Sequence, residues 1–131
     1  MKTILLTILL SLAAVIGVSA QNSNQVSLKL GEQRNVSSPR LAVKFVNVVE
    51  DSRCPMNAKC IWAGNAKVRV TLSSRGRRSR TFELNSTLEP RTIHFGDYTV
   101  TFESLTQKPA GMHRMRAYRP VLVLTVSTPG R

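Results

Sequence analysis

Apolar and polar residues alternate in several short stretches of the chain, and the alternation is most regular around residue 70. There Val68, Val70 and Leu72 are separated by polar residues. A period of two is typical of a strand with one buried side and one side facing solvent. Such patterns predict seven strands, over residues 26–30, 41–49, 61–74, 81–84, 93–95, 98–103 and 118–126.

Turn residues lie between the predicted strands. Gly76 marks a hairpin turn between two of them. Loops are predicted over residues 35–39 and 107–116, where prolines interrupt regular pairing. Gly64 lies in Trp-Ala-Gly-Asn and predicts a bulge or a close approach of two backbone segments.

The strand patterns favour an all-β fold, because no segment shows a helical period long enough to predict a helix. The segments 41–49 and 118–126 contain apolar residues on both sides, which favours central positions in a sheet. We therefore predict an antiparallel β-sandwich of the immunoglobulin-like type with about seven strands; a small β-barrel is the alternative.

The first 20 residues have the layout of a secretory signal peptide. Lys2 precedes an apolar run over residues 4–18, and small residues follow up to Ala20. A membrane anchor is the less favoured alternative, because the run is short for a stable span. The prediction is a signal peptide over residues 1–20 and a single exported domain over residues 21–131, without a transmembrane segment of its own.

The two cysteines of the chain, Cys54 and Cys60, are separated by five residues. Export to an oxidising compartment favours a disulfide that closes this small loop. The alternatives are a redox pair, which usually has two intervening residues, or a metal site, which needs further ligands. Trp62 follows the loop and is predicted to be buried beside the disulfide, with a ligand-stacking ring as the alternative.

The chain is strongly basic, with 19 Lys and Arg against 7 Asp and Glu and a formal net charge of +12. Such a balance favours anionic partners, although it also serves solubility. The densest cluster is formed by Arg75, Arg77, Arg78 and Arg80, and it is predicted to fan out from the hairpin turn and bind phosphate or sulfate groups. Aromatic residues make up only 5% of the chain, which disfavours specific nucleic-acid binding.

A second candidate site lies in the predicted loop near residue 113. Met112, His113 and Met115 bring two thioethers and an imidazole together, and soft ligands of this kind bind Cu(I). Met56 is a further candidate ligand. The neighbouring Arg114 and its positive charge oppose cation binding.

The disulfide loop offers another alternative. A constrained loop binds a protease at a low entropic cost, and Met56 or Lys59 would then enter the protease pocket. The simpler interpretation is a cross-link within a strand connection.

Motifs for catalysis are missing from the sequence. His94 and His113 are the only histidines, and there is no nucleophile elbow, paired-histidine zinc motif or glycine-rich phosphate loop. The prediction is a protein that is not an enzyme and needs no cofactor.

The motif Asp-Ser-Arg-Cys-Pro at residues 51–55, followed by Cys-Ile-Trp-Ala-Gly-Asn-Ala at 60–66, resembles a family of small exported bacterial proteins. The segment 84–90 and Tyr98 before an alternating strand also resemble that family. The resemblance implies a secreted or periplasmic bacterial protein and carries over no catalytic or binding residues. The resulting hypothesis is an exported binding or cell-envelope module that contacts an anionic surface or another protein.

Overall fold

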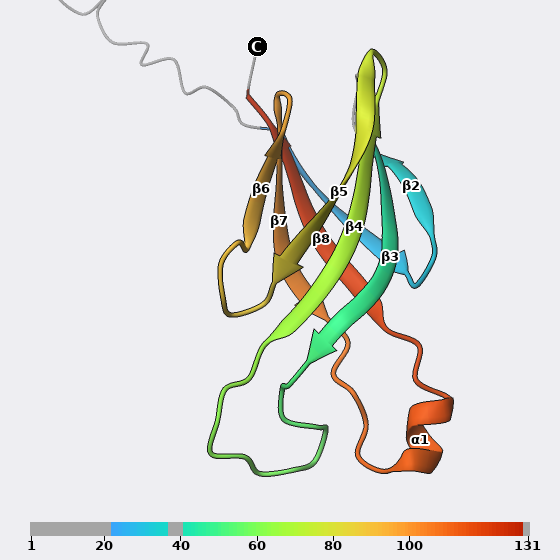
Figure 1. Cartoon of the computed structure of the whole chain (residues 1–131), viewed down its shortest axis with the longest axis vertical. Coiled ribbons are helices and arrows are strands. Elements are labelled where there is room, and N and C mark those ends of the chain that lie inside the picture. Colours follow the sequence, from blue (N-terminus) through green and yellow to red (C-terminus); the bar gives the residue numbers. More distant parts are fainter. Residues whose placement is uncertain (1–21, 37–40, 130–131) are drawn as a thin grey trace, which may run out of the picture.

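The computed structural model describes residues 22–36 and 41–129, which form two antiparallel four-stranded sheets packed face to face (Figure 1). These two sheets confirm the prediction of an antiparallel β-sandwich. The predicted signal peptide over residues 1–20 lies outside the described residues. Each sheet ends in two edge strands, so the described residues do not form the alternative closed barrel.

Both sheets are built mainly from strands that are neighbours in the sequence. One sheet has the order β1 (Asn22–Lys29), β8 (Val121–Thr128), β7 (Tyr98–Leu105), β6 (Thr92–Phe95). The other has the order β2 (Gln33–Val36), β3 (Leu41–Asp51), β4 (Ala66–Ser74), β5 (Arg77–Asn85). The two layers resemble an immunoglobulin-like sandwich, but the chain changes sheet less often than in the immunoglobulin strand order.

One contiguous core fills the space between the sheets. In β4 the predicted alternation is observed, because Val68, Val70 and Leu72 are fully buried and their neighbours are half-buried. The strands predicted to be central, β3 and β8, each have a partner strand on both sides. The other large side chains that are fully buried come from both sheets: Leu28, Leu41, Val43, Phe45, Leu84, Val100, Leu122, Leu124 and Val126.

The structure contains an eighth strand, β2, that the sequence pattern did not predict. Asn35 and Val36 belong to it, although the sequence predicts a loop there. This strand pairs with β3 at the edge of its sheet, and three of its four residues are exposed. An edge strand with so little burial has no regular apolar alternation, so its sequence does not distinguish it from a loop.

Several predicted element boundaries were wrong. Strand β1 begins at Asn22 rather than at residue 26, and β8 begins at Val121 rather than at residue 118. Strand β4 begins at Ala66 rather than at residue 61, so the preceding segment is a loop. Strand β5 begins at Arg77 rather than at residue 81. The predicted loop at 107–116 contains one short helix, α1 (Met112–Arg116), which buries no residue. Among the described residues, no helix is long and apolar enough to cross a membrane.

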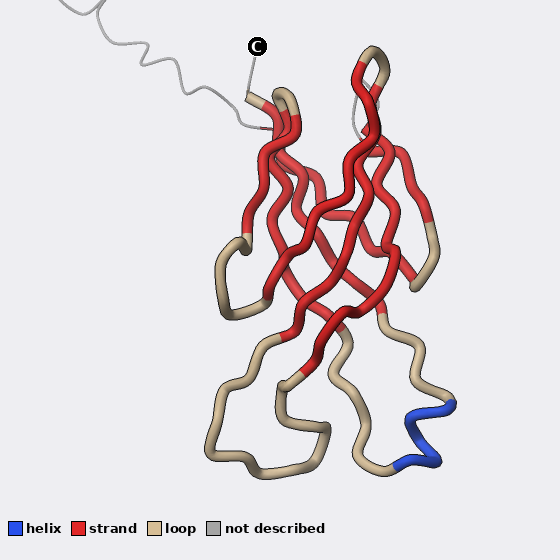
Figure 2. The backbone as a smooth tube through the Cα atoms, in the orientation of Figure 1, coloured by secondary structure: helices blue, strands red, loops and turns tan. Residues whose placement is uncertain are grey.

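The two ends of the sandwich carry different structures. The tight turns β4–β5 and β6–β7 lie at one end, shown at the top of Figures 1 and 2. The long loops over residues 52–65 and 106–120, with α1 in the second, lie at the opposite end (Figure 2). The candidate sites are accordingly divided between a turn end and a loop end.

Candidate functional site

The disulfide between Cys54 and Cys60 is confirmed, with the two Cα atoms 5.8 Å apart. Inside the loop that it closes, the backbone N–H of Ala58 donates to the carbonyl of Pro55 at 3.2 Å. Asn57 has a φ of 64°, the sign that the third residue of a type II turn requires. The loop therefore contains a tight turn rather than an extended segment.

The base of the disulfide loop is closed by contacts between Ser52 and Asn65. The backbone N–H of Ser52 donates to the carbonyl of Asn65 at 2.9 Å, and the N–H of Asn65 donates to Ser52 Oγ at 2.9 Å. Between these contacts, a Cβ atom on Gly64 would lie 2.3 Å from the carbonyl oxygen of Ser52. The predicted close backbone approach at Gly64 is thus confirmed.

The prediction that Trp62 is buried was wrong, because 57% of this residue is exposed. Its indole N–H donates to the carbonyl of Ser52 at 3.0 Å. The cause is the late start of β4 at Ala66, which leaves Trp62 in the loop outside the two sheets. The disulfide is likewise local to that loop and does not connect the sheets.

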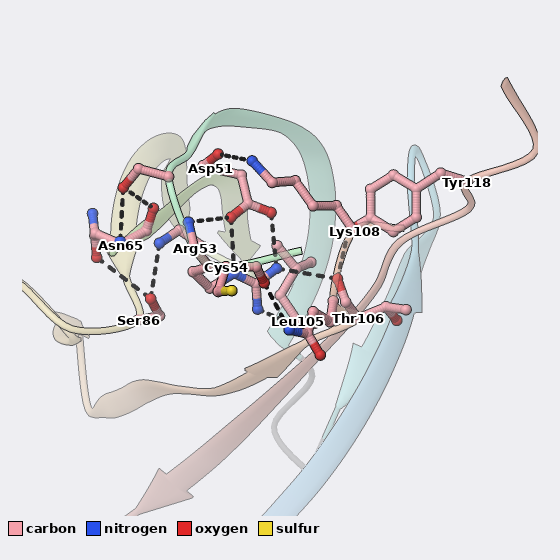
Figure 3. Close-up of polar contacts among 12 residues, drawn as sticks. Asp51, Arg53, Cys54, Asn65, Ser86, Leu105, Thr106, Lys108 and Tyr118 are labelled. Atoms are coloured by element: carbon pink, nitrogen blue, oxygen red, sulfur yellow. Dashed lines mark hydrogen bonds and ion pairs between the residues drawn. The ribbon is translucent and has the colours of Figure 1, made fainter. Parts of the chain in front are cut away.

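The guanidinium of Arg53 forms a bidentate ion pair within its own segment and also binds the start of the second long loop (Figure 3). Arg53 donates through Nε and Nη2 to the two carboxylate oxygens of Asp51, each at 2.9 Å. The same guanidinium donates to the carbonyl of Leu105 at 2.8 Å and to that of Thr106 at 3.1 Å. Burial raises the pKa of Asp51, but the hydrogen bonds and charge of Arg53, with the charge of Lys108, outweigh it and hold the pKa below its usual value.

Further hydrogen bonds make the two loops one unit. Lys108 Nζ donates to the carbonyl of Asp51 at 2.6 Å, and Gln107 Nε2 donates to that of Cys54 at 2.7 Å. The backbone N–H of Met56 donates to the carbonyl of Lys108 at 2.9 Å. The phenol of Tyr118 donates to the carbonyl of Thr106. Burial of the Tyr118 phenol raises its pKa, and the negative charge of Asp51 raises it further. These hydrogen bonds therefore fix the two loops relative to each other.

A buried amide pair holds the segment between β5 and β6. Asn65 Nδ2 donates to Asn85 Oδ1 at 2.9 Å, and Asn85 Nδ2 donates to the carbonyl of Pro90 at 3.3 Å. Asn65 Oδ1 accepts from the backbone N–H groups of Thr87 and Leu88. Residues of the two motif segments, 51–66 and 84–90, therefore bind one another, and these hydrogen bonds give the motif a structural role: they hold the two loops together.

The four arginines of the predicted anion site do not all fan out from the turn. Only Arg75 lies before Gly76, and the other three belong to β5. Arg80 is paired with Leu72, and its guanidinium lies 5.3 Å from the ring centroid of Phe82. A Cβ atom on Gly96 would be 2.6 Å from Arg77 Nε, so Arg77 reaches the β6–β7 turn of the other sheet.

Arg77, Arg78 and Arg80, but not Arg75, line a cleft between the two turns, with a volume of about 350 Å³. We call it the arginine cleft. Its lining residues are Gly76, Arg77, Arg78, Arg80, His94, Phe95 and Gly96. Phe95 and Phe82 meet edge to face at 6.1 Å between centroids, so the cleft adjoins an aromatic contact across the sandwich. Sequence reasoning did not include His94, because β6 approaches β5 only through the packing of two different sheets.

The arginine cleft is electrostatically one-sided. No carboxylate lines it, and among the described residues none of its three guanidinium groups forms an ion pair. Arginine remains protonated throughout the physiological pH range. Three arginines without an ion pair therefore line one cleft, and it can accept an anionic group.

The proposed Cu(I) ligands Met112, His113 and Met115 all lie on α1. The two methionines are three residues apart, which places them on adjoining positions of the helix surface. Within the described part of the chain, no three His, Cys, Asp or Glu side chains converge on a metal site. The Cu(I) hypothesis, which depends on thioethers, stays a prediction.

The proposed inhibitor residues Met56 and Lys59 are both exposed on the disulfide loop. Met56 is held by a backbone hydrogen bond to the second loop and forms an isolated parallel bridge with Pro109. The inhibitor hypothesis also stays a prediction.

No family model matches the chain, and no curated protein or solved structure matches it either. The family resemblance at residues 51–66 consequently remains an expectation from the motif alone.

Proposed function

We propose that the protein is an exported, non-enzymatic binding module of the bacterial cell envelope that holds an anionic group in the arginine cleft. The observation that supports this function is the convergence of Arg77, Arg78 and Arg80 on one cleft without a lining carboxylate. A guanidinium presents N–H donors in a planar fork that fits phosphate, sulfate and carboxylate oxygens.

The surroundings of the cleft support specific binding of one anionic group rather than non-specific attraction by the net charge. The ring of Phe82 and the close approach of Gly96 restrict where the Arg80 and Arg77 side chains lie. Restricted side chains lose less conformational freedom when they bind. The exposed imidazole of His94 adds a further polar group at the edge of the cleft.

The chemical nature of the lining favours binding over catalysis. Its side chains are guanidinium, imidazole and phenyl groups, without a hydroxyl, thiol or carboxylate that could attack a substrate. The shared ligand chemistry is an oxyanion, carried by an acidic glycan or by a phosphorylated surface component.

The test measures binding of pyrophosphate and of a sulfated oligosaccharide by titration calorimetry over a salt series. The variant Arg77→Gln/Arg78→Gln/Arg80→Gln keeps the side-chain stems and removes three charges. The control Lys29→Gln/Arg34→Gln/Lys44→Gln removes three charges from β1, β2 and β3. We expect the cleft variant to lose at least about tenfold in affinity, and the control to lose much less, because screened charges outside the cleft contribute little.

The comparison of the two ligands separates the sources of the oxyanion. Tighter binding of the oligosaccharide than of pyrophosphate indicates a glycan, and the reverse indicates a phosphorylated component. Equal losses in the cleft and control variants would show that net charge alone attracts the ligand, and the cleft proposal would then be abandoned.

A further inference from the structure

Exposed apolar side chains are concentrated at the loop end, opposite the arginine cleft. Of the eight large apolar residues that are exposed in the described part of the chain, five lie in the segments 52–64 and 106–120. They are Met56, Ile61, Trp62, Met112 and Met115. Ile61 is fully exposed and Met112 is 89% exposed. Neither apolar side chain therefore contributes to the core of the domain. We call these five side chains the apolar tip.

The two segments that carry the apolar tip are basic. The same two segments contain six Lys and Arg residues and not one Asp or Glu. These basic residues are Arg53, Lys59, Lys108, Arg114, Arg116 and Arg119. Just before the first segment, Asp51 is paired with Arg53, and the exposed Glu50 is the acidic residue that adjoins it in the sequence. Lys59, Arg114, Arg116 and Arg119 outnumber it.

The two segments are held in place, so the apolar tip is built before any partner arrives. The disulfide closes the first segment, and Arg53 binds the carbonyls of Leu105 and Thr106 at the start of the second. Figure 1 shows both loops projecting from the same end of the sandwich. Exposed side chains on a braced backbone lose less freedom on docking than side chains on an unbraced loop.

We infer that the loop end docks onto an anionic lipid bilayer. Thioether, aliphatic and indole side chains at loop tips enter the boundary between headgroups and acyl chains, where tryptophan is enriched. The surrounding lysines and arginines then lie at the level of the lipid phosphates and are attracted by the negative surface potential. A surface that is uniformly negative outside and apolar beneath matches this arrangement of side chains better than a protein partner of mixed charge.

This inference is independent of the arginine cleft, because the two sites lie at opposite ends of the sandwich. The tight turns that border the cleft lie at the end opposite the long loops (Figure 2), so a bilayer at the loop end leaves the cleft facing away from the membrane. The protein would thus be fixed to a membrane surface by one end and would bind an oxyanion at the other.

The chain carries its own reporter, since Trp62 is its only tryptophan. The experiment uses protein purified after export, with the N-terminus checked by mass spectrometry so that the apolar leader does not contribute. Vesicles of phosphatidylglycerol and of phosphatidylcholine are titrated separately. With phosphatidylglycerol we expect a blue shift of the Trp62 emission and weaker quenching by acrylamide; with phosphatidylcholine we expect much weaker binding.

Variants locate the contact by vesicle sedimentation. Ile61→Asp/Met112→Asp changes two side chains that contribute no buried contact, so the sandwich should fold normally. We expect this variant to lose at least about tenfold in vesicle affinity. The control Leu30→Asp/Leu88→Asp changes two exposed apolar residues outside the segments 52–64 and 106–120. It adds the same two negative charges and should bind almost as the parent does.

Three outcomes would overturn the inference. The first is equal binding to the neutral and anionic vesicles, or to neither. The second is vesicle binding that survives Ile61→Asp/Met112→Asp and is lost in Arg77→Gln/Arg78→Gln/Arg80→Gln, which would assign the contact to the cleft. The third is a concentration-dependent Trp62 shift without lipid, accompanied by dimerisation, which would identify the apolar tip as an interface between two copies. Loss of oxyanion binding in the cleft variant with normal vesicle binding leaves the inference intact.

Discussion

Gly64 lies directly against the backbone of Ser52, at a distance that leaves no room for a side chain. Its Cβ position would be 2.3 Å from the Ser52 carbonyl oxygen, and its φ is +67°. The atoms in the way belong to the backbone and are held by the Ser52–Asn65 hydrogen bonds, so they cannot move alone. Gly64→Ala should lower the free energy of unfolding by more than about 3 kcal/mol, measured by urea denaturation.

Gly31→Ala is the matched control for this prediction. Gly31 also has a positive φ, of +79°, but no atom lies within 4 Å of its Cβ position. Its substitution should cost only about 1 kcal/mol, which is the cost of the left-handed backbone alone. If both variants lose the same stability, the close approach to Ser52 contributes nothing.

The disulfide should stabilise the protein by a modest amount. Cys54 and Cys60 are six positions apart, and a loop of this size corresponds to about 2 kcal/mol in the chain-entropy account. The double variant Cys54→Ser/Cys60→Ser should still fold, because the core does not include the loop. Chemical denaturation with and without a reducing agent measures the effect, and the reducing agent should not change the double variant. Complete unfolding on reduction would contradict this prediction.

The sequence pattern predicted the core well where burial is one-sided. Val68, Val70 and Leu72 alternate with half-buried neighbours because β4 has a covered and an open face. At Trp62 the same reasoning failed. A large aromatic residue before a strand resembles the start of that strand, and only the contact between Gly64 and Ser52 shows that the chain is still in a loop there.

The candidate site was predicted only in part, for a similar reason. The arginine cluster is visible in the sequence, but the arginine cleft also requires His94 and Gly96 from the other sheet. These residues meet the arginines because β5 and β6 are edge strands on the same side of the sandwich, and no local pattern encodes that meeting. The apolar tip likewise depends on two loops about 50 residues apart that are joined through Arg53.

The buried amide pair should be costly to break. Asn85→Ala removes the acceptor of Asn65 Nδ2 and the donor to the Pro90 carbonyl. A buried polar group without a partner is destabilising, so the variant should lose about 2 kcal/mol of unfolding free energy. Asn35→Ala, at an exposed position of β2, is the control and should change stability only slightly. Thermal unfolding of both variants would show the difference, and equal midpoints would mean that the amide pair is not stabilising.

The Asp51–Arg53 ion pair should make stability depend on pH in the acidic range. Because the pKa of Asp51 is lower in the folded protein than its ordinary value of 3.8, the folded state favours the carboxylate. The stabilisation is therefore present above the unfolded pKa and is lost as the pH falls through the folded pKa.

Asp51→Asn tests this dependence, since it keeps the shape of the side chain and removes its charge. Near neutral pH the variant should be less stable than the parent by about 2 kcal/mol, as expected for charged hydrogen bonds that remain partly solvated. The difference should shrink steadily below pH 4, because the parent then becomes protonated and resembles the variant. Urea denaturation of both proteins across this range measures it, with Glu50→Gln, an exposed neighbour, as the control. A difference that stays constant with pH would mean that the charge of Asp51 does not contribute and that only the geometry of its hydrogen bonds does.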